Sequence, residues 1–425
     1  MTQGAPSSAK SPGDTHDNGG DDVRRRLVLF LPGHDPTDMD YHYGRFANQA
    51  ERFAALWNVN VEVSKRLDDG TEPSARWTVD AHGPNWRSRT DYQILRWDDI
   101  VVELDERTDF VRLHRGMRAL WEFLANGTAA RFFKASPRYG FFYGFPFFIV
   151  GFFALVGILA GWGAAALVER MIPDAISILV GIAVAVLVFM GLFHQPGRRW
   201  RLHQALDDWD LAREYLRQRV PTLEARLDQF AELLFNAVHR QRYDEILLVG
   251  HSLGATLILG VLDRALALDP HLCEGPTKVN LMTCGATIPK FALHPGGTRM
   301  REQSERVAAA PGLCWVEFQA RHDVISFYKF HPIALRRTEF DDARHGLPTL
   351  RNANIKQMLS KEKLKKLRWQ AMRIHYQFLL ANERPAGYDY FMFALGPLPF
   401  TTLAFLPEGP IGQFGPDGAL LASMN

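Results

Sequence analysis

The stretch ILLVGHSLGA, residues 246–255, decides the fold of this 425-residue chain. Residues 246–249 form a short, wholly apolar run, which is typical of a strand buried on both faces. After a turn of only a few residues, a helical pattern begins at 254 and continues to 267. The G-x-S-x-G pattern at 250–254 therefore lies in the strand–turn–helix setting of a nucleophile elbow.

This turn would place Ser252 on a strained bend with its hydroxyl exposed above the sheet. Gly250 and Gly254 are predicted to be glycine because any side chain there would collide with the neighbouring strand or helix. The N–H of Leu253 would lie at a helix N-terminus, where it can stabilise an oxyanion. A structural turn that only happens to be flanked by glycines is the alternative.

Apolar strand patterns alternate with helical patterns on both sides of this stretch, which predicts a mostly parallel sheet flanked by helices. The predicted strands are 27–31, 59–64, 76–79, 92–97, 245–249, 279–284 and 314–319, and the predicted helices are 40–57, 111–125, 254–267 and two within 199–241 broken at Pro221.

Residues 139–193 are almost free of charge and interrupt this alternation. The runs 141–168 and 175–193 each approach or exceed the about 20 apolar residues that a membrane-spanning helix needs. The short connector between them predicts an antiparallel hairpin, and a buried hairpin inside a globular core is the alternative. Gly157 and Gly161 form a G-x-x-x-G pair suited to helix packing.

Charge on either side of this segment predicts its orientation. Basic residues flank it, whereas the connector holds two acids and one base. The positive-inside rule then places both long soluble parts and both termini in the cytoplasm, with two spans in the inner membrane. The basic residues before the runs are Arg131, Lys134 and Arg138, and those after them are Arg198, Arg199 and Arg201. The charged residues of the connector are Glu169, Arg170 and Asp174.

Residues 250–254, together with Leu31-Pro32-Gly33-His34 after an early apolar strand, resemble the α/β-hydrolase superfamily and its lipase/esterase-like members. The resemblance covers about 24–130 and 240–385, and the apolar hairpin lies outside it. It implies that the loop after the early strand supplies a second oxyanion N–H, from His34 or Asp35, with Gly33 allowing close approach. An ordinary turn at Pro32-Gly33 is the alternative.

The resemblance also implies a chain order of serine, acid and histidine. Asp323 follows the strand predicted at 314–319 and is our choice for the acid, although an Asp that caps a turn would look the same. Glu317, Asp341 and Asp342 are weaker choices, because the first is mid-strand and the others lie in a polar stretch.

The base is predicted to be His375, since the family places its histidine late in the core. One departure is that the sequence around His375 reads as helix and no clear final strand precedes it. His331 is the second choice. His345 lies in a charged loop, and His322 is next to the predicted acid, too close in sequence to face it easily.

The predicted organisation has five parts. Residues 1–22 form a polar tail expected to be disordered. Residues 23–138 and 195–385 are the two halves of the hydrolase-like domain, with 139–194 as the transmembrane hairpin between them. Residues 386–425 form an apolar C-terminal segment, in which Pro397 and Pro399 disfavour a third span.

Composition narrows the functional classes. A net charge of +2 gives no nucleic-acid signal, and three cysteines cannot form a disulfide framework. No metal-ligand spacing or phosphate-binding glycine loop is visible, so no metal or cofactor is expected. The basic run 361–368 reads as a solvated face or as a contact with anionic lipid.

These features predict a membrane-anchored serine hydrolase that cleaves a carboxylic ester or thioester, including lipid-like ones, through an acyl-enzyme on Ser252. The expected partners are the bilayer and the ester substrate. The alternatives are an acyltransferase that uses the same serine and a non-catalytic membrane scaffold that has kept the fold.

Overall fold

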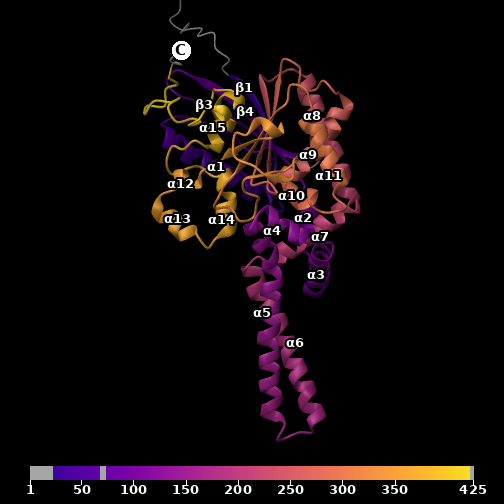
Figure 1. The fold of residues 1–425 in the computed structure, drawn as a ribbon. Coiled ribbons are helices and arrows are strands. Elements are labelled where there is room, and N and C mark those ends of the chain that lie inside the picture. The colour runs from indigo at the N-terminus through magenta and orange to yellow at the C-terminus, as the bar shows by residue number, and fades with distance from the viewer. Residues whose placement is uncertain (1–22, 68–72, 422–425) are drawn as a thin grey trace, which may run out of the picture.

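The computed structural model describes residues 23–67 and 73–421, and the tail predicted at 1–22 lies outside the described residues. The chain forms an α/β body with two long helices, α5 (Pro137–Val168) and α6 (Asp174–Arg199), that project from one end (Figure 1).

The body is built on an eight-stranded sheet in the order β10-β7-β6-β5-β1-β4-β3-β2. Strands β10 to β4 in this order are mutually parallel, whereas β3 is antiparallel to both β4 and β2. The predicted mixed α/β class with a mostly parallel sheet is thus confirmed. The strands are β1 Arg25–Leu31, β2 Asn60–Val63, β3 Ser74–His82, β4 Arg87–Leu95, β5 Glu245–His251, β6 Lys278–Cys284, β7 Cys314–Gln319 and β10 Thr349–Asn352.

Strand β1 joins the two parts of the sequence that flank α5 and α6. It pairs with β4 from the first part and with β5 from the second. Alternate residues of β1 enter different cores, because side chains alternate across a strand. Leu27 and Leu29 pack on one face of the sheet, whereas Val28 and Phe30 pack on the other.

Helices cover both faces, as Figure 1 shows. One face is covered by α8 (Pro221–His239), α9 (Leu253–Leu268) and α11 (Thr298–Ala308). The other is covered by α1 (Met39–Trp57) and the C-terminal helices α15 (Tyr390–Leu395) and α16 (Phe400–Phe405). The C-terminal segment thus packs on the sheet, and within 23–67 and 73–421 only α5 and α6 are long and apolar enough to cross a membrane.

Helices α5 and α6 lie side by side along most of their length (Figure 1). A Cβ added to Gly161 would lie 2.3 Å from the Gly181 carbonyl oxygen, and one added to Gly157 would lie 2.7 Å from that of Ala185. Small residues therefore allow the backbones to approach, as the G-x-x-x-G pair predicts. Gly163 faces open space and takes no part in this contact.

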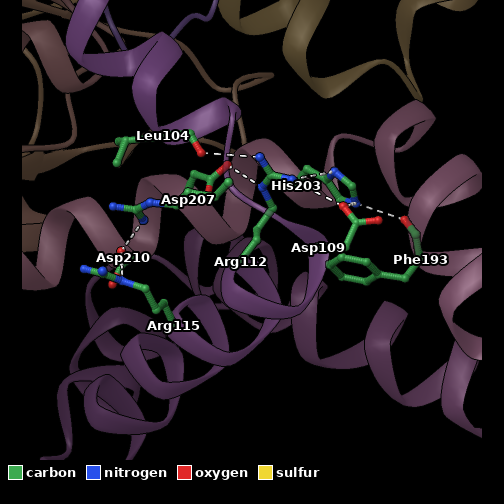
Figure 2. A network of polar contacts seen from close by, with 9 residues as sticks. Leu104, Asp109, Arg112, Arg115, Phe193, His203, Asp207 and Asp210 are labelled. Carbon is green, nitrogen blue, oxygen red and sulfur yellow. Dashed lines mark hydrogen bonds and ion pairs between the residues drawn. The ribbon is translucent and has the colours of Figure 1, made fainter. Parts of the chain in front are cut away.

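A buried polar network joins the base of α6 to the body (Figure 2). Arg112 of α3 (Asp109–Ala125) is 2% exposed, and its Nε donates to Asp207 of α7 (Leu202–Leu216) at 2.7 Å. The next residue in the network, His203, bonds through Nε2 to the Phe193 carbonyl oxygen at 3.0 Å. Three helices are thereby held together where the projecting pair begins.

The sequence patterns missed several elements. Strands β3 and β4 are longer than predicted, because their polar residues alternate with buried ones. Strand β10 was not predicted, since only Leu350 of its four residues is apolar and buried. The remaining elements are α2 Asp98–Asp105, α4 Thr128–Ala135, α10 Ile288–Ala292, β8 Phe330–His331, β9 Arg336–Arg337, α12 Ile355–Met358, α13 Lys361–Leu367, α14 Ala371–His375 and two 3-10 helices, Ala343–His345 and Tyr376–Leu379.

Candidate active site

Ser252 occupies the turn between β5 and α9 with φ 57° and ψ −124°, a region that side-chain-bearing residues rarely adopt. Its N–H donates to the Cys284 carbonyl oxygen at the end of β6, at 3.1 Å. A Cβ on Gly254 would lie 2.0 Å from the Leu31 carbonyl oxygen, and one on Gly250 would lie 2.6 Å from Ala255 Cα. Both glycines are required by close backbone approach.

The loop after β1 runs directly beside the serine. A Cβ on Gly33 would lie 2.8 Å from Ser252 Cβ and 3.3 Å from its Oγ. His34, the following residue, lines the same cavity as Ser252. Leu253 opens α9, so its N–H has no partner within the helix. The loop and the helix start, the two predicted sources of oxyanion donors, thus lie on either side of one hydroxyl.

His375 and Asp323 form a buried pair. His375 Nδ1 lies 2.8 Å from Asp323 Oδ2, and both side chains are almost fully buried. The carboxylate also accepts the Ser326 hydroxyl on Oδ2 at 2.6 Å and the Ile325 N–H on Oδ1 at 3.0 Å. These bonds fix the carboxylate, which in turn favours the imidazole tautomer that carries its proton on Nδ1.

His375 Nε2 is buried and has no hydrogen-bond partner among the described residues. With the proton on Nδ1, this nitrogen is an acceptor. The ring packs against Gly285, where an added Cβ would lie 2.9 Å from His375 Cε1. Gly285 directly follows Cys284, whose carbonyl oxygen holds the Ser252 N–H. The His375 ring therefore packs on the residue that directly follows Cys284, to which the Ser252 turn is hydrogen-bonded.

His251 supports the position of His375 from below. Its Nε2 donates to the His375 carbonyl oxygen at 3.0 Å, and the two ring centroids are 4.5 Å apart. Burial holds the pKa of His251 well below its usual range, so the ring stays neutral beside His375. The next residue, Tyr376, donates to Asp35 Oδ2 at 2.5 Å and so connects the segment that carries His375 to the loop after β1.

A cavity of about 890 Å³ contains Ser252, His34 and His375. Its volume lies within the range of known small-molecule sites, about 300–1,000 Å³. The walls come from the base of α5, the junction of α6 with α7, and the segment that leads into α14. They are mainly aromatic and basic: Arg138, Tyr139, Phe141, Phe142 and Phe145 from α5, Arg199, Trp200 and Arg201 from the junction, and Trp369 and Arg373 near α14.

The second-choice residues lie elsewhere. His331 does not line this cavity, and its Nδ1 accepts the N–H groups of Ile333 and Ala334. Glu317 is buried within β7, where its Oε1 accepts from Gln319 at 2.6 Å. Asp342 caps a 3-10 helix and bonds Arg344, and its neighbour Asp341 bonds Arg351. None of these groups lines the cavity that contains Ser252.

Sequence reasoning did not find several supporting residues. Gly285 directly follows a predicted strand, and a glycine at that position is a sequence signal of close packing that could have identified it. Ser326 lies three residues after Asp323, a spacing at which a hydroxyl can bond the carboxylate. The Tyr376–Asp35 bond spans 341 positions and has no local signal.

No protein-family model matches the chain, and comparisons with curated proteins and with solved structures give no match.

Proposed function

We propose that this protein is a membrane-anchored serine hydrolase of the α/β-hydrolase type, which cleaves carboxylic esters or thioesters through an acyl-enzyme on Ser252. One observation carries the proposal. A serine on a strained strand-to-helix turn shares a cavity with a histidine whose Nδ1 is bonded to a buried carboxylate and whose Nε2 is unbonded. This set of groups is what acyl transfer from a serine requires.

In the proposed reaction, His375 Nε2 accepts the Ser252 proton as Oγ attacks the acyl carbon. The N–H groups of Leu253 and His34 stabilise the oxyanion. The bond to the leaving alcohol or thiol then breaks, and His375 returns the proton to that group. Water next attacks the acyl-enzyme with the same histidine as base, and His375 returns this proton to Ser252 Oγ as the acyl–Oγ bond breaks and the carboxylic acid leaves. Asp323 holds the imidazole tautomer and stabilises the imidazolium throughout.

We further propose that α5 and α6 form a transmembrane hairpin. Apart from Phe141, which lines the cavity at the base of α5, the exposed large apolar side chains of α5 lie between Phe148 and Leu167, a length of about 29 Å at about 1.5 Å per residue. That length equals the hydrocarbon thickness of a bilayer, about 30 Å. Basic residues at the base of both helices favour a cytoplasmic body, in the inner membrane, with both termini on the same side.

Hydrolysis of a p-nitrophenyl acyl ester by the full chain in detergent micelles tests the function. We expect the wild-type chain to turn over the ester and Ser252→Ala to lose at least about a thousandfold in kcat. Ser360→Ala, which removes a helix-capping hydroxyl at α13, is the matched control and should retain the activity. Turnover that is equal in wild type and Ser252→Ala would favour the scaffold alternative.

A further inference from the structure

The active-site cavity reaches the level at which the lipid-facing surface begins. Four aromatic residues of α5 line it, and the last of these, Phe145, is three positions before Phe148. Phe148 is 72% exposed, and from there to Leu167 large apolar side chains of α5 recur on its exposed surface. Three residues are less than one helical turn. A molecule could therefore place its acyl chain along α5 and its ester near Ser252 without leaving the membrane boundary.

The same walls carry an excess of positive charge. Four exposed arginines line the cavity, and none has a carboxylate partner among the described residues: Arg138, Arg199, Arg201 and Arg373. Arg138 donates to the Arg321 carbonyl oxygen, and Arg201 donates to Gln204 Oε1 at 2.8 Å. These are neutral acceptors, so the charges remain uncompensated.

The acidic side chain in the cavity wall does not offset them. Asp208 Oδ2 lies 2.5 Å from the ammonium of Lys290, which is almost fully buried. This carboxylate is therefore already neutralised by its own partner. Arginine forms strong paired hydrogen bonds with phosphate and carboxylate groups, which makes the cluster suited to an anionic headgroup.

We propose that the substrate is a membrane-resident acyl ester with an anionic headgroup, held by Arg199 and Arg373, while its acyl chain lies against the aromatic residues of α5. This inference rests on the proposed function and names the substrate class for the same site. A phosphate and a carboxylate headgroup share the required chemistry. The proposal commits to a lipid in the bilayer rather than a free anionic ester in solution.

The test compares esters that differ only in headgroup or chain, with the full chain in vesicles of non-hydrolysable ether lipid. The probes are 1-decanoylglycerol 3-phosphate, 1-decanoylglycerol and the water-soluble 1-butanoylglycerol 3-phosphate. We expect kcat/KM for the decanoyl phosphate to exceed that for the neutral decanoyl ester by about tenfold or more. Of the two phosphate esters, the butanoyl ester should have the lower kcat/KM.

Arg199→Gln/Arg373→Gln should reduce the phosphate-to-neutral ratio to near one, and each single change should reduce it in part. Both side chains are exposed, so the changes leave the core intact. The matched control is Arg240→Gln/Arg242→Gln, which removes two exposed charges just before β5, at the end of that strand opposite Ser252, and should keep the ratio.

The outcomes separate the two proposals. An unchanged ratio in the Arg199/Arg373 variants would overturn the headgroup assignment. Equal use of the butanoyl and decanoyl phosphates would overturn the membrane source. A wild-type chain that hydrolyses none of the esters and whose Ser252 does not react with a fluorophosphonate would instead overturn the proposed function itself.

Discussion

In the proposed mechanism, the Ser252 hydroxyl depends on a base, His375, that is itself held in one orientation. The Asp323 carboxylate accepts three hydrogen bonds, so it cannot rotate without breaking several of them. The donors are His375 Nδ1, Ser326 Oγ and the Ile325 N–H. Each of these bonds limits the positions that the carboxylate, and with it the imidazole, can take. The reactivity proposed for the serine therefore originates in a carboxylate that does not touch it.

Asp323→Asn tests this chain of contacts. A neutral amide can donate to His375 Nδ1 and so favours the wrong tautomer, with the proton on Nε2. We expect ester hydrolysis to fall by about 10⁴-fold in kcat. His331→Gln is the matched control and should retain activity. Loss in His331→Gln with retention in His375→Gln would show that the base is misassigned.

Glu317 allows a prediction on pH and stability. Burial within β7 raises the pKa of this carboxyl from 4.5 to about 7. The folded state therefore binds this proton more tightly than the unfolded state, and stability falls as pH rises between these two values. Relative to Glu317→Gln, wild type should lose about 2.5 kcal/mol of unfolding free energy between pH 5 and pH 8. Urea titrations in micelles at both pH values measure this, and parallel pH profiles would contradict it.

At the scale of secondary-structure elements, local sequence patterns correctly predicted those elements that are determined by residues close together in the chain. The elbow, the helix after it and the two apolar helices follow from residues within a few turns of one another. Strand β10 has only one buried apolar residue and forms because β7 offers it a partner. The cavity walls could not be predicted, because they combine α5, α7 and α14 from distant parts of the sequence.

The packing of α5 against α6 depends on Gly161 but not on the nearby Gly163. Gly161→Leu would push a side chain into the Gly181 carbonyl and separate the helices, whereas Gly163→Leu would project into open space. We expect Gly161→Leu to lower the thermal unfolding temperature in micelles and Gly163→Leu to leave it nearly unchanged. Equal effects would show that this face is not the packing interface.

The network at the base of α6 gives a second paired prediction. Arg112→Ala would remove the buried cation that pairs with Asp207, which costs about 3–5 kcal/mol of unfolding free energy. Arg115 lies one turn away and bonds Asp210 at 2.9 Å, but it is substantially exposed. Arg115→Ala should therefore cost at most about 1 kcal/mol. Chemical denaturation of both variants tests this, and similar losses would refute the distinction.

At the scale of the whole molecule, two helices project from one end of the body (Figure 1), and residues at the base of both line the cavity. Trp369, which lines that cavity, is 84% exposed, as expected of an aromatic side chain at a membrane boundary. In the proposed arrangement, a polar reaction site would lie at the surface of the bilayer. This placement explains physically why two apolar helices would be inserted between strands of one sheet.

Topology provides the prediction at this scale. Met171 lies in the connector of α5 and α6 and is 84% exposed. In intact cells, a membrane-impermeant maleimide should label Met171→Cys from outside the inner membrane and should label Trp369→Cys only after the membrane is opened. Labelling of Trp369→Cys in sealed cells would reverse the proposed orientation.

The most direct measurement is a fluorophosphonate reaction with the full chain in micelles, followed by mass-spectrometric mapping of the modified peptide. The account predicts one adduct, on Ser252, that is lost in Ser252→Ala and forms far more slowly in His375→Gln. A folded chain without an adduct, or with one on another serine, would contradict the claim that the hydroxyl at the β5–α9 turn is a nucleophile.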